Sequence, residues 1–118
     1  APDLQDTEVR DLATALIAAQ IDGVIATNTT LDRERVKGQK HAEQAGGLSG
    51  SVLSDKSQHI TALLCKELKG CMPVIGVGGI DGADTAKMRI EGGTPLIQIY
   101  SSLIYKGPKV IKEIVNSL

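Results

Sequence analysis

The chain has 118 residues, with 13 Lys and Arg against 14 Asp and Glu, so its net charge is −1 and it forms one small domain or part of a larger one. This near-neutral charge argues against general nucleic-acid binding, and two Tyr without Trp or Phe exclude an aromatic platform for stacking bases. Hydrophobic residues make up 42%, which supports a packed core, and their runs are too short to span a membrane.

The cysteines and histidines are few and widely spaced. Cys65 and Cys71 are too few for a disulfide scaffold and fit a reducing compartment. His41 and His59 have no Cys, His or Asp partner at the spacing of metal ligands. We therefore expect no metal site.

The first quarter of the chain predicts a helix followed by a strand. The segment Thr7–Gln20 has the helical repeat, with Asp6 as its N-cap and one apolar stripe formed by Val9, Leu12, Ala13, Leu16 and Ile17. Gly23–Thr27 is a short apolar run that we interpret as a buried strand. The glycine-containing segment Asn28–Leu53 shows no period, and an irregular loop of this length is usually functional.

A second helix and strand follow the loop. The helix is predicted to begin at Ser54 or Asp55, to end at Lys69 before Gly70, and to bury Ile60, Leu63, Leu64 and Leu68. Pro73–Val77 is predicted to be a second buried strand.

The last part of the chain repeats this order. Asp81 is the predicted cap of a helix that reaches about Glu91, and Leu96–Tyr100 is the third strand. Pro108 begins a last helix, whose predicted inward residues are Val110, Ile111, Ile114 and Val115.

Hydrophobic strands that alternate with helices are typical of a parallel sheet covered by helices. The pattern alone fits a piece of a doubly wound sheet and a piece of a (β/α)8 barrel equally well. Three strands cannot close a barrel and leave two open edges, so we expect the chain to be part of a larger fold or to pair with a partner. The start at Ala1, without an initiator Met, fits either processing or a missing upstream part.

Candidate binding residues follow the first strand. Thr27, Asn28, Thr29 and Thr30 carry short side chains that form hydrogen bonds, and an Asn amide both donates and accepts. They suit a planar polar ligand such as an amide, an imide or a carboxylate. The alternative is that they only stabilise the turn, where Asn and Thr are common.

The other two strand ends suggest a phosphate site. Gly78 and Gly79 follow the second strand and leave backbone N–H groups open, although paired glycines also mark ordinary turns. Tyr100, Ser101 and Ser102 follow the third strand, and the loop Gly46–Gly50 adds further backbone. Together these features indicate a nucleotide or flavin phosphate site. No carboxylate pair and no Ser-His or Cys-His couple is evident.

Several strings of residues carry a family resemblance. They are Ala1-Pro2-Asp3-Leu4, Asp22–Leu31 with Arg33, Gly46–Gly50, Pro73–Ile80, Leu96–Ser101 and Lys106-Gly107-Pro108. In this order they resemble the C-terminal part of class 2 dihydroorotate dehydrogenase, the quinone-dependent form. The resemblance implies that residues 1–118 are the C-terminal portion, about three βα units, of an FMN-binding (β/α)8 barrel whose upstream half is absent here.

The resemblance also implies an activity and a set of site residues. The reaction is the oxidation of dihydroorotate to orotate in pyrimidine synthesis, with FMN as cofactor and quinone as acceptor. Asn28 and Thr29 match the pair that binds the orotate ring. The expected FMN contacts are Thr27, Gly50, Gly78, Gly79, Tyr100 and Ser101, of which the last two lie on the phosphate side.

Some features of the family have no match in this chain. The catalytic Ser lies on an upstream loop, so we expect no catalytic residue here and no activity of the chain alone. The N-terminal helices that bind the membrane and admit quinone are also unmatched, and Ser51 stands where the family usually has Arg. For the full-length enzyme the resemblance implies a peripheral location on the cytoplasmic face of the bacterial inner membrane, and for this segment alone a soluble one.

Two other functions stay open for the chain by itself. It is either a half-barrel that binds FMN or phosphate without chemistry, or a structural piece that self-associates through its open sheet edges. The first is motivated by the phosphate-side residues without a base, and the second by the count of three strands.

Overall fold

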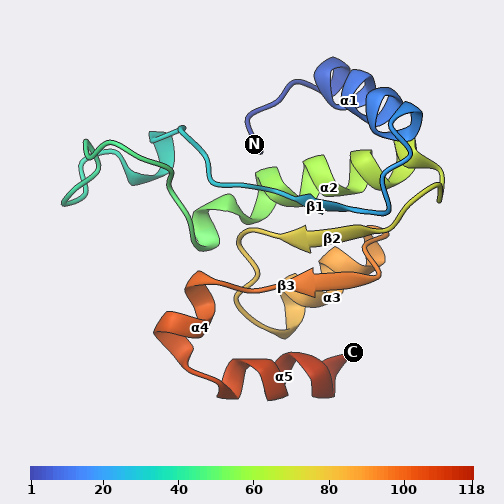
Figure 1. The fold of residues 1–118 in the computed structure, drawn as a ribbon. Helices are drawn as coiled ribbons and strands as arrows, with labels where there is room; N and C mark the ends of the chain where they lie inside the picture. The colour runs from blue at the N-terminus through green and yellow to red at the C-terminus, as the bar shows by residue number, and fades with distance from the viewer.

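Three parallel strands form the centre of the protein (Figure 1). The computed structural model describes residues 1–118 and contains β1 (Val24–Ala26), β2 (Val74–Val77) and β3 (Leu96–Gln98) in the spatial order β1-β2-β3. The register places Val24 opposite Val74, and Ile75 opposite both Ile25 and Leu96. Because all strands point the same way, their carboxyl ends meet at one edge of the sheet.

The helices confirm the predicted order of elements, with one short helix added before the last. They are α1 (Asp6–Ala18), α2 (Ser54–Leu68), α3 (Ala83–Glu91), α4 (Ser101–Lys106) and α5 (Lys109–Ser117). The segment between β1 and α2 contains only two 3-10 turns, Glu34–Val36 and Ser51–Leu53. No helix combines the length and the apolar character that crossing a bilayer requires.

The helix ends differ from the prediction in their capping residues. Asp6 is not the cap of α1: Gln5 holds that position, and its backbone N–H donates to Glu8 Oε2 at 2.7 Å, while Asp6 pairs with His59 at 2.7 Å. Asp81 does not cap α3 either, because Gly82 is the N-cap and Thr85 Oγ1 accepts both nearby N–H groups. The side chains of Glu8 and Thr85 thus accept backbone N–H groups at the start of each helix, where no carbonyl of the helix is available.

The helices cover only one face of the sheet. Side chains alternate between the two faces of a strand, and residues paired in a parallel register share a face. Val24, Ala26 and Val74 pack against α1 and α2, and Ile97 packs against the cluster formed with α3 and α5. These residues all belong to the same face.

The opposite face of the sheet has no helix over it. Ile25 is 60% exposed and Leu96 is 58% exposed, and the register places both on this face beside Ile75. The prediction that Gly23–Thr27 is a buried strand is therefore wrong for Ile25. A doubly wound sheet has helices on both faces, whereas the strands of a (β/α)8 barrel have helices outside and one another's side chains inside. The arrangement is that of a barrel segment.

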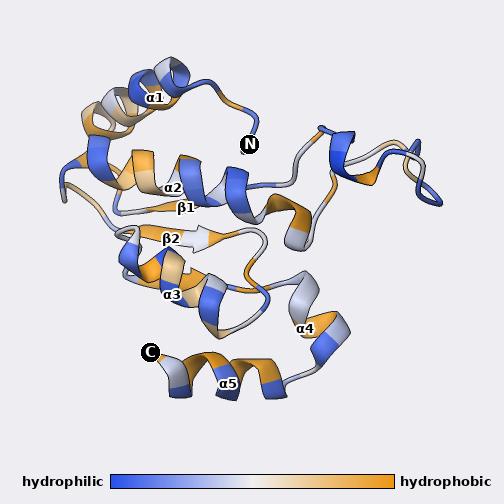
Figure 2. Ribbon diagram, turned by 180° about the vertical axis from the view of Figure 1, so that it is seen from behind, coloured by the Kyte–Doolittle hydropathy of each residue, from blue (hydrophilic) through white to orange (hydrophobic).

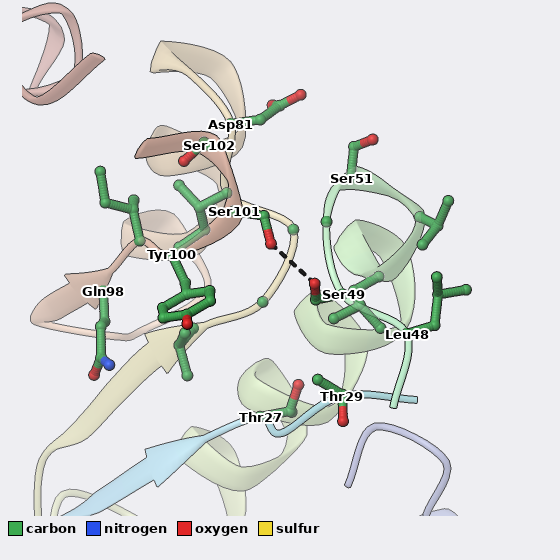
Figure 3. A pocket seen from close by; sticks show the side chains of 18 of the residues that line it. Thr27, Thr29, Leu48, Ser49, Ser51, Asp81, Gln98, Tyr100, Ser101 and Ser102 are labelled. Carbon is green, nitrogen blue, oxygen red and sulfur yellow. Dashed lines mark hydrogen bonds between the residues drawn. The ribbon is translucent and has the colours of Figure 1, made fainter. Parts of the chain in front are cut away.

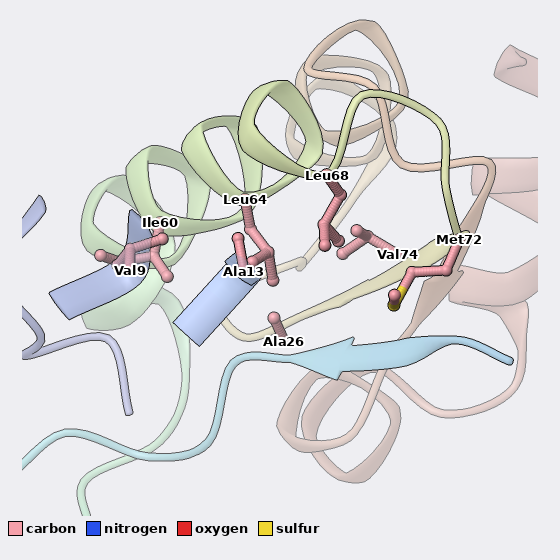
Figure 4. Close-up of a cluster of buried hydrophobic side chains, with 8 residues drawn as sticks. All are labelled: Val9, Ala13, Ala26, Ile60, Leu64, Leu68, Met72 and Val74. Atoms are coloured by element: carbon pink, nitrogen blue, oxygen red, sulfur yellow. The ribbon is translucent and has the colours of Figure 1, made fainter. Parts of the chain in front are cut away.

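The larger core cluster joins α1 and α2 to the sheet (Figure 4). Val9 and Ala13 of α1 meet Ile60 and Leu64 of α2, and Leu68 lies over Val74. Each of these side chains is at most 5% exposed. Full burial of one such aliphatic side chain contributes about 1.5–3 kcal/mol.

A smaller cluster holds the C-terminal helix. It consists of Ile80, Ala86, Val110 and Ile114. The ribbon of α5 carries several hydrophobic residues (Figure 2), of which Ile111 is 47% and Val115 is 64% exposed. The prediction that these two point inward is wrong, because α3 covers only the Val110–Ile114 stripe. The first helix likewise leaves Leu12 and Ile17 exposed.

Candidate functional site

A cleft of about 750 Å³ opens at the carboxyl ends of the three strands (Figure 3). Its wall comes from the end of each strand and from the loop before α2. All the residues that the resemblance assigns to FMN or orotate line it, namely Thr27, Asn28, Thr29, Gly50, Gly78, Gly79, Tyr100 and Ser101. Thr30, the other candidate after the first strand, is buried outside the cleft and binds Asp3 instead. The structure thus brings together segments that lie far apart in the chain.

The end of β1 contributes one buried and two more accessible polar side chains. Thr27 is buried: its N–H donates to Val77 O at 2.8 Å and its Oγ1 donates to Ser57 Oγ at 3.0 Å. The exposed Asn28 accepts the N–H of Thr29 on Oδ1 at 2.7 Å. This contact turns the amide oxygen back to the chain, so the NH₂ group is the part left to donate to a ligand.

The end of β2 contributes backbone that passes very close to α2. Gly78 has a φ of 109° and Gly79 has a φ of 74°, in the left-handed region that favours glycine. A Cβ at Gly78 would stand 2.9 Å from Ser57 Oγ, and a Cβ at Gly79 would overlap the backbone of Ser54. Glycine is required here both by the conformation and by the space.

The end of β3 contributes hydroxyl groups and the first turn of α4. Tyr100 is 72% exposed, and Ser101 Oγ donates to Ser49 Oγ at 3.0 Å across the cleft (Figure 3). Ser102 Oγ also lies at the cleft wall and is buried without a hydrogen-bond partner. The first N–H groups of a helix have no partner within the helix, so this corner is rich in donors.

The loop between β1 and α2 is held beside the cleft by backbone and side-chain contacts. Thr30 and Leu48 exchange backbone hydrogen bonds of 3.1 and 2.8 Å, and Arg33 donates to the carbonyl of Gly46. Ser49 and Gly50 follow in the lining, Gly50 with a φ of 96°. The loop between β1 and α2 therefore forms one side of the cleft.

An ionic cluster fixes the start of this loop. Lys56 Nζ lies 3.2 Å from Asp3 Oδ1 and 2.7 Å from Asp32 Oδ2, and Asp3 also accepts from Thr30 Oγ1 and from Leu31 N. Burial opposes ionisation of Asp3, but these hydrogen bonds outweigh it and lower its pKa. The Lys56 hydrogen bond lowers the pKa of Asp32, and the Asp32 and Asp3 hydrogen bonds raise the pKa of Lys56.

A second polar network lies beneath the cleft. Its central residue, Arg89, was not among the residues predicted from the sequence. Arg89 of α3 is 1% exposed and donates to Ser57 Oγ at 2.8 Å and to Gly78 O at 2.9 Å. Ser57 in turn donates to Val77 O at 2.7 Å and accepts from Thr27 Oγ1. The helical spacing of Arg89 could have indicated its burial, because Arg89 follows the buried Ala86 by three residues and so lies on the inner side of the helix.

The lining is suited to binding and not to proton transfer. Apart from two Tyr, its only titratable residues are Asp81 and Lys106, and Lys106 donates to the backbone carbonyl of Asp81. No group of three or more His, Cys, Asp or Glu side chains is placed to hold a metal ion. The cleft offers short hydroxyls, the amides of Asn28 and Gln98, and backbone donors, which match a planar polar molecule and an anionic group.

Comparison with known proteins gives one consistent family. The family model described as dihydroorotate dehydrogenase matches residues 1–118. The dihydroorotate dehydrogenase (quinone) of Pseudoalteromonas atlantica is 67% identical over the whole chain, and that of Haemophilus influenzae is 52% identical.

Solved structures agree with this result. A crystal structure of ligand-free dihydroorotate dehydrogenase from Eimeria tenella superposes on 100% of the chain with a TM-score of 0.92 at 36% identity. The same enzyme in complex with ferulenol gives a TM-score of 0.92 at 35% identity. The chain spans about a third of the length of these proteins, 35% of the curated relatives and 33% of the ligand-free structure.

Proposed function

The chain belongs to the dihydroorotate dehydrogenase family, and on this basis we propose that it forms the C-terminal part of a quinone-dependent enzyme. That enzyme oxidises dihydroorotate to orotate in pyrimidine synthesis. The observation that carries the proposal is the single cleft at the strand ends, which gathers every residue that the family resemblance assigns to FMN or orotate.

We assign the inner part of the cleft to FMN. The phosphate is held by the backbone of Gly78 and Gly79 and by the corner formed by Tyr100 and Ser101. The support is that both glycines have the left-handed φ that leaves their backbone accessible to a ligand, and that Ser102 Oγ in the same lining is a buried hydroxyl without a hydrogen-bond partner. FMN, when bound, supplies the ring that takes the hydride from dihydroorotate and passes electrons to quinone. Thr27 and Gly50 contact the cofactor on the sides nearer β1 and the loop.

Asn28 and Thr29 hold the substrate in this assignment. Orotate is a planar ring with amide and imide groups and a carboxylate, so it presents carbonyl oxygens that accept hydrogen bonds. The Asn28 NH₂ group is free to donate because its oxygen is already bound to Thr29 N–H. Thr29 Oγ1 adds a hydroxyl at the same strand end. These two side chains orient the ring and fix its register.

The remaining machinery comes from sequence that this chain does not contain. The only carboxylate of the cleft, Asp81, already accepts a hydrogen bond from Thr85 Oγ1, so we assign the base to another segment of the barrel. The bare face of the sheet, with Ile25 and Leu96 exposed, is then the barrel interior, and the outer edges of β1 and β3 pair with further strands. Quinone access and peripheral attachment to the inner membrane also belong to the rest of the enzyme.

The experiment is an assay of the full-length protein that carries this chain. Orotate formation is followed by its absorbance, with dihydroorotate as donor and a soluble quinone as acceptor. The proposal expects quinone-dependent turnover by the full-length protein and none by residues 1–118. A full-length protein that folds and binds FMN but does not oxidise dihydroorotate contradicts it.

The cleft also supports a second function for the chain alone, which is binding without chemistry. The site is assembled from these residues, while its only carboxylate, Asp81, already accepts a hydrogen bond from Thr85. Titration of residues 1–118 with FMN, followed by flavin fluorescence, tests this function. Sedimentation of the same sample shows whether the open edges cause self-association instead.

A further inference from the structure

Arg89 is a fully buried cation with no acidic partner. Its guanidinium donates from Nε to Gln58 Oε1 at 2.9 Å, from Nη1 to Ser57 Oγ at 2.8 Å and Val77 O at 3.3 Å, and from Nη2 to Gly78 O at 2.9 Å. It takes part in no ion pair. Every partner is a neutral oxygen, so the positive charge itself is left without compensation inside the protein.

The fold makes room for this side chain. A Cβ at Gly76 of β2 would stand 2.5 Å from Arg89 Cγ and 2.7 Å from its Cδ, so the aliphatic part of Arg89 lies directly on the strand backbone. From there the guanidinium reaches the end of β2, where the chain turns into the cleft. Burial lowers the pKa of Arg89, although a guanidinium stays charged in proteins.

The contacts of Arg89 lead into the cleft. Gly78, whose carbonyl it binds, is itself a lining residue, and the N–H of Gly79 belongs to the same peptide unit as that carbonyl. Ser57, its other partner, receives the hydroxyl of Thr27 and donates to Val77 O, so its one proton and two acceptor sites are all used. One buried charge therefore fixes the ends of both β1 and β2.

Holding an uncompensated charge in the interior is costly, because the ion loses its hydration without gaining an opposite charge. An anion in the cleft would stand across the Gly78–Gly79 peptide from the guanidinium. A guanidinium bound to the carbonyl end of a peptide polarises it, and this strengthens the N–H at the other end as a donor.

We infer that Arg89 is a positioning residue for the phosphate of the cofactor: it clamps the Gly78 peptide and supplies the buried positive charge that favours a phosphate dianion at this strand end. The inference rests on the proposed function, because it takes the anion in the cleft to be the phosphate of FMN. Arg89, which lies outside the cleft, would then be the residue that makes the site prefer a phosphorylated flavin to an unphosphorylated one.

The test compares the dissociation constants of FMN and riboflavin, which differ by the phosphate, for flavin-free full-length protein. Arg89→Met should weaken FMN binding by about tenfold or more, as expected for one lost charge-assisted interaction, and leave riboflavin binding within about twofold. Arg89→Lys, which keeps the charge, should restore most of the preference for FMN. Lys87→Met is the matched control, since it removes a positive charge from an exposed position of the same helix.

A second measurement follows the wild-type protein and needs a variant only to assign one signal. The Nε–H signal of Arg89, identified as the one missing from Arg89→Lys, should shift in nitrogen NMR when FMN binds and stay unchanged when riboflavin binds. The inference would be overturned if Arg89→Met weakened the binding of FMN and riboflavin equally. It would also be overturned if the Nε–H signal shifted equally, or not at all, with the two flavins. If the wild-type protein binds no FMN at all, the proposed function itself fails.

Discussion

The side chain of Thr29 fills the space that a Cβ atom at Gly47 would need. Gly47 has no left-handed φ, so Ala fits its backbone and the conflict is with Thr29 alone. Gly47→Ala should therefore displace Thr29 and raise the KM for dihydroorotate by about tenfold, the effect of one lost hydrogen bond to substrate. Steady-state kinetics of the full-length protein measures this change.

Gly82→Ala is the matched control for Gly47→Ala. A Cβ at Gly82 would stand 3.5 Å from Glu113 Oε1, an ordinary contact, and Gly82 does not line the cleft. We expect its KM to equal that of the wild type. A Gly47→Ala protein with an unchanged KM would show that Thr29 does not hold the substrate.

Asn28 allows a test that separates its donor from its acceptor. Asn28→Asp keeps an oxygen for the N–H of Thr29 but loses the NH₂ donors and adds a negative charge facing an anionic substrate. It should lower kcat/KM for dihydroorotate more than Asn28→Ala, by about a hundredfold against about tenfold. FMN affinity should stay unchanged in both. An Asn28→Asp variant with the activity of the wild type would exclude the donor role.

The order of elements and the place of the site were predictable from the sequence. Each strand was a short apolar run, and each was followed by the polar or glycine residues that now line the cleft, from Thr27 to Ser101. The rule that ligands bind at the carboxyl ends of parallel strands joined them into one site. The family resemblance then selected the barrel from two folds that the pattern alone did not separate.

The errors came from features that depend on tertiary packing. Ile111 and Val115 have the helical spacing of inward residues, but α3 covers only the stripe of Val110 and Ile114. Arg89 was not selected because a charged residue in a helix is normally solvated, and its burial depends on the absence of a side chain at Gly76. The spacing of residues within one helix predicts neither the packing of α5 against α3 nor that of Arg89 against Gly76.

One inner and one outer position of α5 give a direct test of this packing. Ile114 is 4% exposed and Ile111 is 47% exposed. For residues 1–118, Ile114→Ala should lower the free energy of unfolding by about 3 kcal/mol through lost burial and a cavity, and Ile111→Ala by less than about 1 kcal/mol. Urea denaturation followed by circular dichroism measures both. Equal losses would place Ile111 in the core, as its spacing first indicated.

The cluster of Asp3, Asp32 and Lys56 predicts a dependence of stability on acid pH. Both carboxyl pKa values are lowered in the folded state, so the stabilisation is present above the ordinary Asp value of 3.8 and is lost as the pH falls through the lower folded values. The raised pKa of Lys56 keeps its contribution up to its ordinary value of 10.5. Lys56→Met should flatten the acid limb of a plot of melting temperature against pH. An unchanged acid limb would show that the cluster does not stabilise the fold.

The central claim is that the strand-end backbone holds the FMN phosphate, and titration of flavin-free full-length protein with FMN tests it most directly. Flavin fluorescence should be quenched with saturation at one equivalent. Gly79→Ala should weaken this binding by about tenfold or more, because its Cβ would overlap the backbone of Ser54 and shift the peptide away from the phosphate. Gly82→Ala should leave the affinity unchanged. Absence of saturable binding, or an affinity that Gly79→Ala leaves intact, would contradict the account.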